Sequence, residues 1–210
     1  MRSFQNLSKS PIIGFVRSSQ TVDDLRRLRH SLGPLPEPVV RPSLVVVSGL
    51  PGTGKSYFCR RLAERTPVVI LESDALRKVI FHSPSYSGDE SADLFEAINR
   101  LAADLLAKGI TPVVDATNLE EYHRERLYHV AEQRGARLIV VQIWAPPEVV
   151  HQRLLRRAGR KDPSDSSDAD WQVYQRMRSN AEIIRRNHFK VDTSRDIAPA
   201  VEKIAAIIDR

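Results

Sequence analysis

The fold of this chain is decided by the stretch Gly49-Leu50-Pro51-Gly52-Thr53-Gly54-Lys55-Ser56. A glycine, four further residues and Gly-Lys-Ser form the spacing of a phosphate-binding loop. Glycine lets the backbone wind tightly with its N–H groups toward phosphate oxygens, and the dipole of a following helix favours the same anion. The Lys55 side chain can reach β- and γ-phosphates, and the Ser56 hydroxyl can bind Mg²⁺. The stretch therefore predicts a nucleoside triphosphate site, and we expect ATP with Mg²⁺.

The segments around this loop alternate between strand and helix patterns. Short apolar runs predict strands at 44–47, 68–71, 111–114, 138–144 and 189–192. Apolar residues three and four apart predict helices at 55–64, 93–108, 121–134, from 147 onward, at 169–186 and over 197–208. Such alternation is typical of a parallel sheet with helices on both faces. We therefore expect a three-layer α/β/α fold with a five-stranded parallel sheet.

Residues 1–42 are expected to form an N-terminal extension outside this domain, which we place at 43–210. The extension is polar and becomes rich in proline toward its end. Inside it, Thr21 can cap a short helix that Gly33 ends. The leucines of that helix share one face, at three- and four-residue spacing: Leu25, Leu28 and Leu32. We expect this face to dock on the domain or on a partner.

Composition narrows the class of protein. A length of 210 residues favours one domain, and 41% hydrophobic residues suffice for a core. No apolar run approaches the roughly 18–20 residues of a membrane helix, so we expect no membrane association. The single cysteine, Cys59, excludes an intrachain disulfide, which favours a reducing, cytoplasmic location. No motif indicates a protein partner.

The net charge of +6 has two interpretations. A basic surface attracts phosphorylated partners, nucleic acid among them. Alternatively, the arginines are scattered over solvated faces. The charge total does not decide between these interpretations, whereas the local clustering of arginines is more informative.

Asp74 and Arg77 follow the second predicted strand, at the sheet edge where open α/β sheets bind ligands. The Asp74 carboxylate can accept the proton of an attacking hydroxyl, or it can cap a helix from Ala75 onward. Arg77 lies three residues later on the same side of that helix, where it can bind a phosphate of the acceptor or remain a surface arginine. The pair is a candidate for the acceptor side of a phosphoryl-transfer site.

Asp115 ends the third predicted strand, and Asn118 follows three residues later. An acidic residue at this place can hold a water bound to Mg²⁺, or it can cap a helix. Farther along, several arginines crowd one helix end: Arg153, Arg156, Arg157 and Arg160. Because like charges at such spacing repel, we expect an anion there. A flap carrying these arginines can close on ATP and stabilise transition-state charge, or the arginines can form a solvated face.

Taken together, these motifs resemble the P-loop kinase group that includes the 5′-hydroxyl polynucleotide kinases and the zeta-toxin-like kinases. The resemblance rests on the loop at 49–56, on Ser73-Asp74-Ala75-Leu76-Arg77, on Asp115-Ala116-Thr117-Asn118-Leu119 and on the arginine-rich flap. It covers residues 43–210 and implies a sheet order of 2-3-1-4-5 with a helical lid at about 157–170. Asp74 would then be the general base, Arg77 would contact a phosphate of the acceptor strand, and a flap arginine, Arg157, would stabilise the transferring phosphate.

The expected site follows from the motifs and the resemblance together. The catalytic residues are Lys55, Asp74 and Arg157. The residues expected to bind the nucleotide are Gly49, Pro51, Gly52, Thr53, Gly54, Lys55, Ser56, Tyr57, Arg153 and Arg157. The residues expected to bind the acceptor are Asp74, Arg77, Asp115, Thr117 and Asn118. Ser56 and Asp115 are the expected metal ligands.

Two acceptor classes stay open for such a Mg²⁺-dependent ATP phosphotransferase. The basic charge and Arg77 favour a polynucleotide 5′-hydroxyl, whereas one compact domain without an aromatic stacking platform favours a small metabolite. A different class of function is a P-loop ATPase that acts as a switch or scaffold. In that protein Asp74 would be only a helix cap, and the N-terminal helix would bind a partner.

Overall fold

A computed structural model describes residues 23–159 and 169–210. The predicted cap Thr21, the flap residue Arg160 and most of the expected lid lie outside these residues. Five parallel strands form one sheet in the order β2-β3-β1-β4-β5. The strands are β1 (Ser43–Ser48), β2 (Val69–Glu72), β3 (Pro112–Asp115), β4 (Arg137–Trp144) and β5 (Phe189–Asp192). The strand order implied by the resemblance is therefore confirmed.

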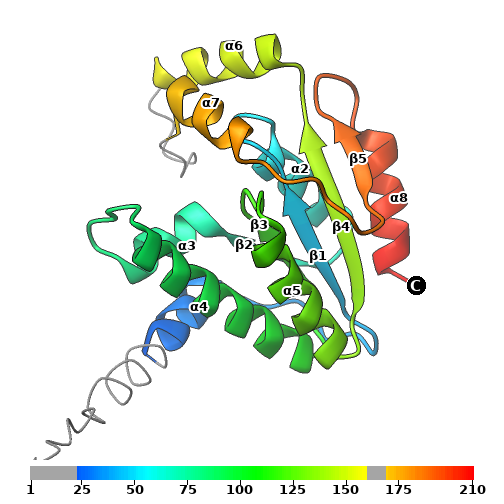
Figure 1. The fold of residues 1–210 in the computed structure, drawn as a ribbon. Helices are drawn as coiled ribbons and strands as arrows, with labels where there is room; N and C mark the ends of the chain where they lie inside the picture. Colours follow the sequence, from blue (N-terminus) through cyan, green and yellow to red (C-terminus); the bar gives the residue numbers. More distant parts are fainter. Residues whose placement is uncertain (1–22, 160–168) are drawn as a thin grey trace, which may run out of the picture.

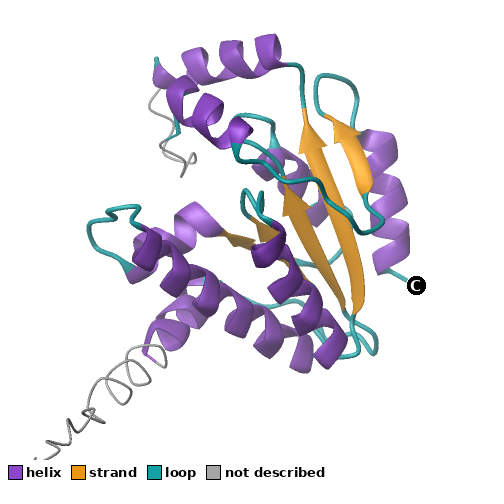
Figure 2. Ribbon diagram, in the orientation of Figure 1, coloured by secondary structure: helices purple, strands orange, loops and turns teal. Residues whose placement is uncertain are grey.

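Helices cover both faces of the sheet (Figures 1 and 2). They are α2 (Lys55–Ala63), α3 (Ser73–Ile80), α4 (Gly88–Ala107), α5 (Glu121–Gln133), α6 (Pro147–Ala158), α7 (Trp171–Ser179) and α8 (Ala198–Ile208). In Figure 1, α6 and α7 lie beyond the carboxyl ends of the strands. None of the helices in the described part of the chain combines the length and apolarity that crossing a bilayer requires.

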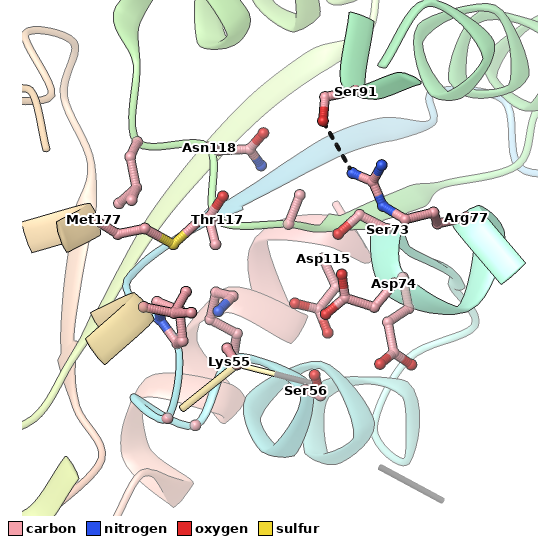
Figure 3. A pocket seen from close by; sticks show the side chains of 18 of the residues that line it. Lys55, Ser56, Ser73, Asp74, Arg77, Ser91, Asp115, Thr117, Asn118 and Met177 are labelled. Carbon is pink, nitrogen blue, oxygen red and sulfur yellow. Dashed lines mark hydrogen bonds between the residues drawn. The ribbon is translucent and has the colours of Figure 1, made fainter. Parts of the chain in front are cut away.

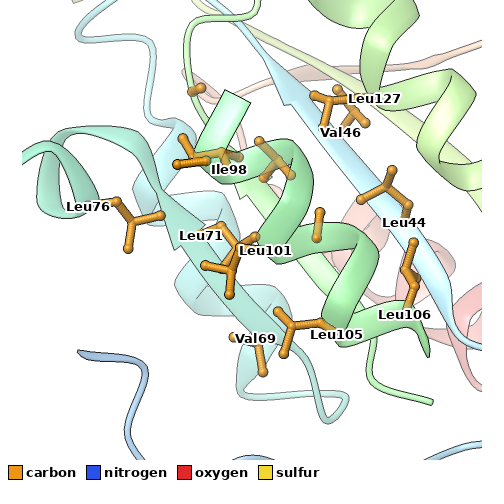
Figure 4. Packing of buried hydrophobic residues seen from close by; sticks show 14 of the residues in the cluster. Leu44, Val46, Val69, Leu71, Leu76, Ile98, Leu101, Leu105, Leu106 and Leu127 are labelled. Atoms are coloured by element: carbon orange, nitrogen blue, oxygen red, sulfur yellow. The ribbon is translucent and has the colours of Figure 1, made fainter. Parts of the chain in front are cut away.

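The central strand β1 is buried along its whole length, which explains its run of β-branched residues. Successive side chains of a strand point to opposite faces. Leu44 and Val46 therefore pack against α4 and α5 in one core cluster (Figure 4), while Val45 and Val47 pack against α2 and α8 in the other. This double burial fixes the strand whose end carries the phosphate-binding loop.

The segment 23–31 is helical, and its leucine face docks on the domain as the spacing predicts. Leu28 is fully buried within the cluster that contains α4, and Leu25 and Leu32 pack against it. Arg29 adds an ion pair with Asp104 of α4 at 2.7 Å. The N-terminal helix therefore belongs to the same core as the sheet.

Two predicted helix boundaries were wrong. Helix α4 begins at Gly88 rather than at 93, because the Ser87 side chain accepts a hydrogen bond from the Glu90 N–H and starts the helix earlier. Helix α7 ends at Ser179 rather than at 186. Beyond it, Glu182 donates its N–H to the Leu119 carbonyl, and the buried Arg124 donates to the carbonyls of Glu182 and Ile183. Tertiary hydrogen bonds there replace those of a longer helix.

Candidate active site

A cavity of about 880 Å³ opens at the carboxyl ends of the strands. We call its two sides the donor wall and the acceptor wall. The donor wall consists of the lining residues from the phosphate-binding loop, α2, α6 and α7. The acceptor wall consists of the lining residues within 72–95, from the end of β2 to α4, and within 116–123, from the segment after β3 to the start of α5. Figure 3 shows side chains of both walls meeting around Asp115.

The phosphate-binding loop is held in a conformation that requires glycine. Gly54 has a φ of +94° and precedes α2 as its N-cap. A Cβ at Gly54 would come within 3.2 Å of the Thr193 side chain, so backbone angle and space both restrict this position. Thr53 is buried, and its hydroxyl donates to the Leu50 carbonyl at 2.7 Å, while the Gly49 N–H donates to the Thr117 carbonyl at 3.0 Å. Gly49 and Thr53 thus shape the loop, whereas Pro51, Gly52, Gly54 and Tyr57 line the cavity.

Lys55 lies at the start of α2 and lines the cavity. Its ammonium donates a hydrogen bond to the Leu50 carbonyl at 3.2 Å, within the loop itself. Burial lowers the pKa of Lys55, although the charges of Asp115 and Asp74 oppose this shift. A bound anion would add to the countercharge that Asp115 and Asp74 provide for this buried cation.

Ser56 and Asp115 form a set of oxygen atoms that suits Mg²⁺. Both residues line the cavity, and Asp115 is 2% exposed. One of its carboxylate oxygens, Oδ2, is buried without a hydrogen-bond partner among the described residues. Burial raises the pKa of Asp115 despite the nearby Lys55 charge. A hard cation with oxygen ligands would satisfy the orphan oxygen, so these residues fit the expected metal.

Asp74 lies in the first turn of α3 and lines the cavity. Its side chain points toward that of Asp115 in Figure 3. The alternative role as a helix cap for Ala75 was wrong, because α3 already begins at Ser73 with Glu72 as N-cap and without a side-chain capping bond. The carboxylate of Asp74 therefore faces the cavity, close to the place where the donor and acceptor walls meet.

Arg77 is not a surface arginine. Its side chain is 8% exposed and forms an ion pair with Glu90 of α4 at 2.5 Å. A second contact, to the Ser91 hydroxyl at 3.4 Å, is drawn in Figure 3, where the guanidinium points toward α4 and away from Asp74. The sequence predicted that Arg77 lies beside the acceptor. It did not predict that a carboxylate already binds the guanidinium.

Thr117 and Asn118 line the cavity on the turn after β3. Asn118 has a φ of +44°, which asparagine tolerates better than most residues, and its amide donates to the Val47 carbonyl at 2.7 Å. The backbone carbonyl of Asn118 accepts hydrogen bonds from the buried Arg124 side chain at 2.7 Å and from the Ser48 hydroxyl at 2.9 Å. These bonds tie the turn to β1, so Asn118 holds the sheet edge in shape.

The arginines of the flap separate into different roles. Arg153 and Arg157 line the cavity, whereas Arg156 is exposed on the same helix. Arg153 donates to the carbonyl and hydroxyl of Thr193, at 2.7 and 2.9 Å, and thereby joins α6 to the end of β5. Arg157 donates to the Ala169 carbonyl at 3.1 Å, at the start of the segment that leads into α7.

A sequence model of the AAA domain family (AAA_33) matches residues 44–184, more than half of the chain. The chain belongs to this family. A UPF0200 protein of Saccharolobus solfataricus is 24% identical over 137 residues, which cover 62% of this chain and 72% of that protein. This AAA domain thus resembles a family of proteins whose name states no activity.

Solved structures extend the likeness of this AAA domain at the level of fold. The Mycobacterium tuberculosis APS kinase in complex with AMPPNP and APS has a TM-score of 0.61 and 20% identity, covering 83% of this chain and all of the kinase chain. Chaetomium thermophilum Kti12 in complex with ADP-AlF3 has a TM-score of 0.63 and 22% identity, covering 79% of this chain and 98% of that one. These similarities show that the chain shares its fold with these P-loop proteins.

Several residues that line or support the cavity of the AAA domain were not predicted from the sequence. They are Arg60, Phe95, Glu120, His123 and Arg176, together with Glu90 behind Arg77 and Thr193 behind Arg153. A capping box at Ser87 and Glu90 was the one local signal for this group, since it marks a helix start. The other residues lie on helix faces or strand ends whose partners are distant in sequence.

Proposed function

We propose that this protein is a Mg²⁺-dependent ATP phosphotransferase that moves the γ-phosphate to a hydroxyl of a small molecule. The observation that carries the proposal is the shared cavity of Lys55, Ser56, Asp74 and Asp115. A phosphate-binding loop alone serves many P-loop functions. A carboxylate facing the same cavity from α3 adds a group that can orient and deprotonate an acceptor, which phosphoryl transfer requires.

Each residue has a role in this proposal. Ser56 and Asp115 would hold Mg²⁺, which supplies countercharge for the phosphates when it is bound. The loop N–H groups and Lys55 bind the phosphates and stabilise charge on the transferring group. Asp74 accepts the proton of the acceptor hydroxyl. Arg157 contributes positive charge from the flap, on the donor wall.

The cavity volume favours a small acceptor. Small-molecule sites occupy roughly 300–1,000 Å³, and this cavity of about 880 Å³, which includes the side that would hold the nucleotide phosphates, lies within that range. The space left for an acceptor, between the acceptor wall and α7, therefore suits a small molecule. A polynucleotide 5′-hydroxyl is the second candidate, which the basic net charge of +6 favours.

The test is a screen of hydroxyl acceptors with γ-labelled ATP. The panel contains sugars, nucleosides, an aminoglycoside and a single-stranded oligonucleotide with a 5′-hydroxyl. We expect Asp74→Asn to lower transfer by about 10²–10⁴-fold while ATP binding is retained. Asp89→Asn, an exposed carboxylate at the start of α4, is the matched control and should keep wild-type activity.

A P-loop switch or scaffold gives the opposite result. In that case no acceptor is labelled, and Asp74→Asn hydrolyses ATP at the wild-type rate. Salt-dependent binding of the oligonucleotide, together with its labelling, would instead favour the polynucleotide acceptor over the small molecule.

A further inference from the structure

Arg77 is the arginine of the acceptor wall, and its charge is already neutralised. The guanidinium forms the ion pair with Glu90, and both side chains are more than nine-tenths buried. The ring of Tyr86 lies 4.9 Å from the guanidinium carbon, measured to the ring centroid. A carboxylate and an aromatic ring therefore occupy positions where an acceptor phosphate would have to bind.

Glu90 is fixed more firmly than a surface carboxylate. Its Oε2 accepts from the N–H of Ser85 at 2.6 Å and from the Ser85 hydroxyl at 2.7 Å, and its Oε1 accepts from the Tyr86 N–H at 3.3 Å. Burial opposes ionisation of Glu90, but these bonds and the bond from Arg77 outweigh it and lower the pKa to about 2. The carboxylate is thus ionised at neutral pH, and displacing it from Arg77 would also loosen the segment that precedes α4.

The remainder of the acceptor wall adds no positive charge. Among the described lining residues of this wall, the basic side chains are Arg77 and His123. Burial lowers the pKa of His123 below its ordinary value, which favours the neutral imidazole at pH 7. Asp74 and Glu120 add carboxylates to the same wall. With Arg77 and Glu90 as a neutral pair, the acceptor wall is acidic.

The donor wall has the opposite composition. The basic side chains that line it are Lys55, Arg60, Arg153, Arg157 and Arg176. The cavity therefore divides into a basic side, suited to a triphosphate, and an acidic side opposite it. Phe95 lies on the acidic side and stacks on His123, with ring centroids 4.6 Å apart and an interplanar angle of 24°. These rings give the acceptor wall an uncharged surface as well.

We infer that the acceptor is a hydroxyl compound without a phosphate group, neutral or positively charged, and that Glu90 imposes this choice by neutralising Arg77. The inference rests on the proposed phosphotransferase function and narrows its substrate class. A phosphorylated acceptor would place its dianion against the carboxylates of this wall, and like charges brought together repel. It also reverses the role that the resemblance implies for Arg77, because a buried ion pair replaces the phosphate contact.

The first experiment measures anion binding without any transfer reaction. Protein saturated with Mg²⁺ and the unreactive analogue AMPPNP is titrated with inorganic phosphate by calorimetry. Glu90→Gln uncovers the Arg77 charge, and we expect it to bind phosphate at least about tenfold more tightly than the wild-type protein does. Glu120→Gln is the matched control, since it removes one carboxylate from the same wall and leaves Arg77 paired.

Three results would overturn the inference. Tight and equal phosphate binding by the wild-type protein and by Glu90→Gln shows that Arg77 is available in the wild type. Weak and equal binding by both proteins shows that Glu90 is not what keeps phosphate from Arg77. An equal gain in Glu120→Gln assigns the effect to the total charge of the wall rather than to Glu90.

The second experiment uses wild-type protein alone, so it does not depend on a variant that folds. Matched acceptor pairs that keep the same primary hydroxyl are compared with γ-labelled ATP: glucose with glucose 1-phosphate, and adenosine with adenosine 3′-monophosphate. We expect the unphosphorylated member to be labelled at least about tenfold faster. Preference for the phosphorylated member overturns the inference and leaves the kinase function intact. Absence of any labelled acceptor counts against the proposed function. The phosphate titration still tests whether Glu90 neutralises Arg77.

Discussion

The two walls of the cavity hold their arginines in opposite ways. On the donor wall, Arg153 donates its hydrogen bonds to uncharged oxygens of Thr193, and the Asp192 carboxylate acts on it only through space. On the acceptor wall, Arg77 pairs with the carboxylate of Glu90, so its charge is cancelled. In this cavity, an arginine that bonds neutral oxygens keeps its charge available to an anion, whereas an arginine paired with a buried carboxylate does not.

The walls also differ in how the chain builds them. The donor wall centres on a loop of eight consecutive residues, whose backbone is fixed by short-range bonds and by Thr193. The acceptor wall joins α3, α4 and the turn after β3, which lie far apart in sequence. The conformation of the loop restricts which residues it can contain, so it tolerates few substitutions. The side chains of the acceptor wall come from separate elements, so single substitutions can change its charge.

The largest expected effect is on phosphoryl transfer, and it comes from a substitution in the donor wall. Lys55→Met removes the cation that reaches the phosphates, and we expect kcat for phosphoryl transfer to fall by about 10²–10³-fold. The thermal unfolding midpoint should not fall, because the substitution removes a cation whose pKa is lowered by burial. Labelled-ATP kinetics and a melting curve check both parts. Lys78→Met, an exposed lysine on α3, is the control, and a loss below tenfold for Lys55→Met would refute the role.

A smaller effect, on KM for ATP, should follow from removing the hydrogen bonds that support the donor wall. Arg153→Gln removes the bridge from α6 to Thr193, which packs beside Gly54. Charged hydrogen bonds contribute about 1.5–3 kcal/mol when buried, and Arg153 is partly exposed, so we expect about a five- to tenfold rise in KM for ATP. The KM for the acceptor should stay unchanged.

Arg156→Gln is the matched control for this bridge, because Arg156 is exposed on the same helix. If Arg156→Gln raises KM for ATP as much as Arg153→Gln does, the effect is one of total charge. In that case the hydrogen bonds from Arg153 to Thr193 would not explain the effect on ATP binding.

The smallest expected effect concerns acid stability of the acceptor wall. The pKa of Glu90 is lowered from 4.5 to about 2, so its carboxylate stabilises the fold above pH 4.5 and this contribution is lost as the pH falls toward 2. Urea unfolding at several pH values should show a steeper loss of stability in the wild-type protein than in Glu90→Gln. Ser85→Ala, which removes one donor to Glu90, should give an intermediate slope. Equal slopes in all three proteins would contradict the strong binding of this carboxylate.

Much of the sheet and the donor loop could be predicted because their signals are local. The apolar run that became β1 is buried on both faces, and the glycine spacing specifies a loop that needs φ angles of +75° and +94° at Gly52 and Gly54. Asp74 and Asp115 follow strands, and parallel strands bring their carboxyl ends to one edge. The shared cavity of these residues therefore follows from strand order and spacing.

The helix after residue 169 shows why other features could not be predicted. Its apolar pattern continues past Ser179, yet the helix ends there. The buried Arg124, more than fifty residues earlier, binds the carbonyls of Glu182 and Ile183 at 3.3 and 3.1 Å. A periodic pattern reports the face that a helix would bury, but it does not report a distant donor that competes for its backbone carbonyls.

By itself, the sequence determined the phosphate-binding loop, the order of strands and helices, and the acidic residues at the strand ends. These features depend on backbone angles and on side chains a few residues apart. Tertiary structure decided the charge of each wall. The Arg77–Glu90 pair spans 13 residues and the Arg153–Thr193 bond spans 40, and each depends on how separate elements pack. The phosphate-binding loop is therefore specified by local sequence, whereas the character of the acceptor site arises only when α3 meets α4.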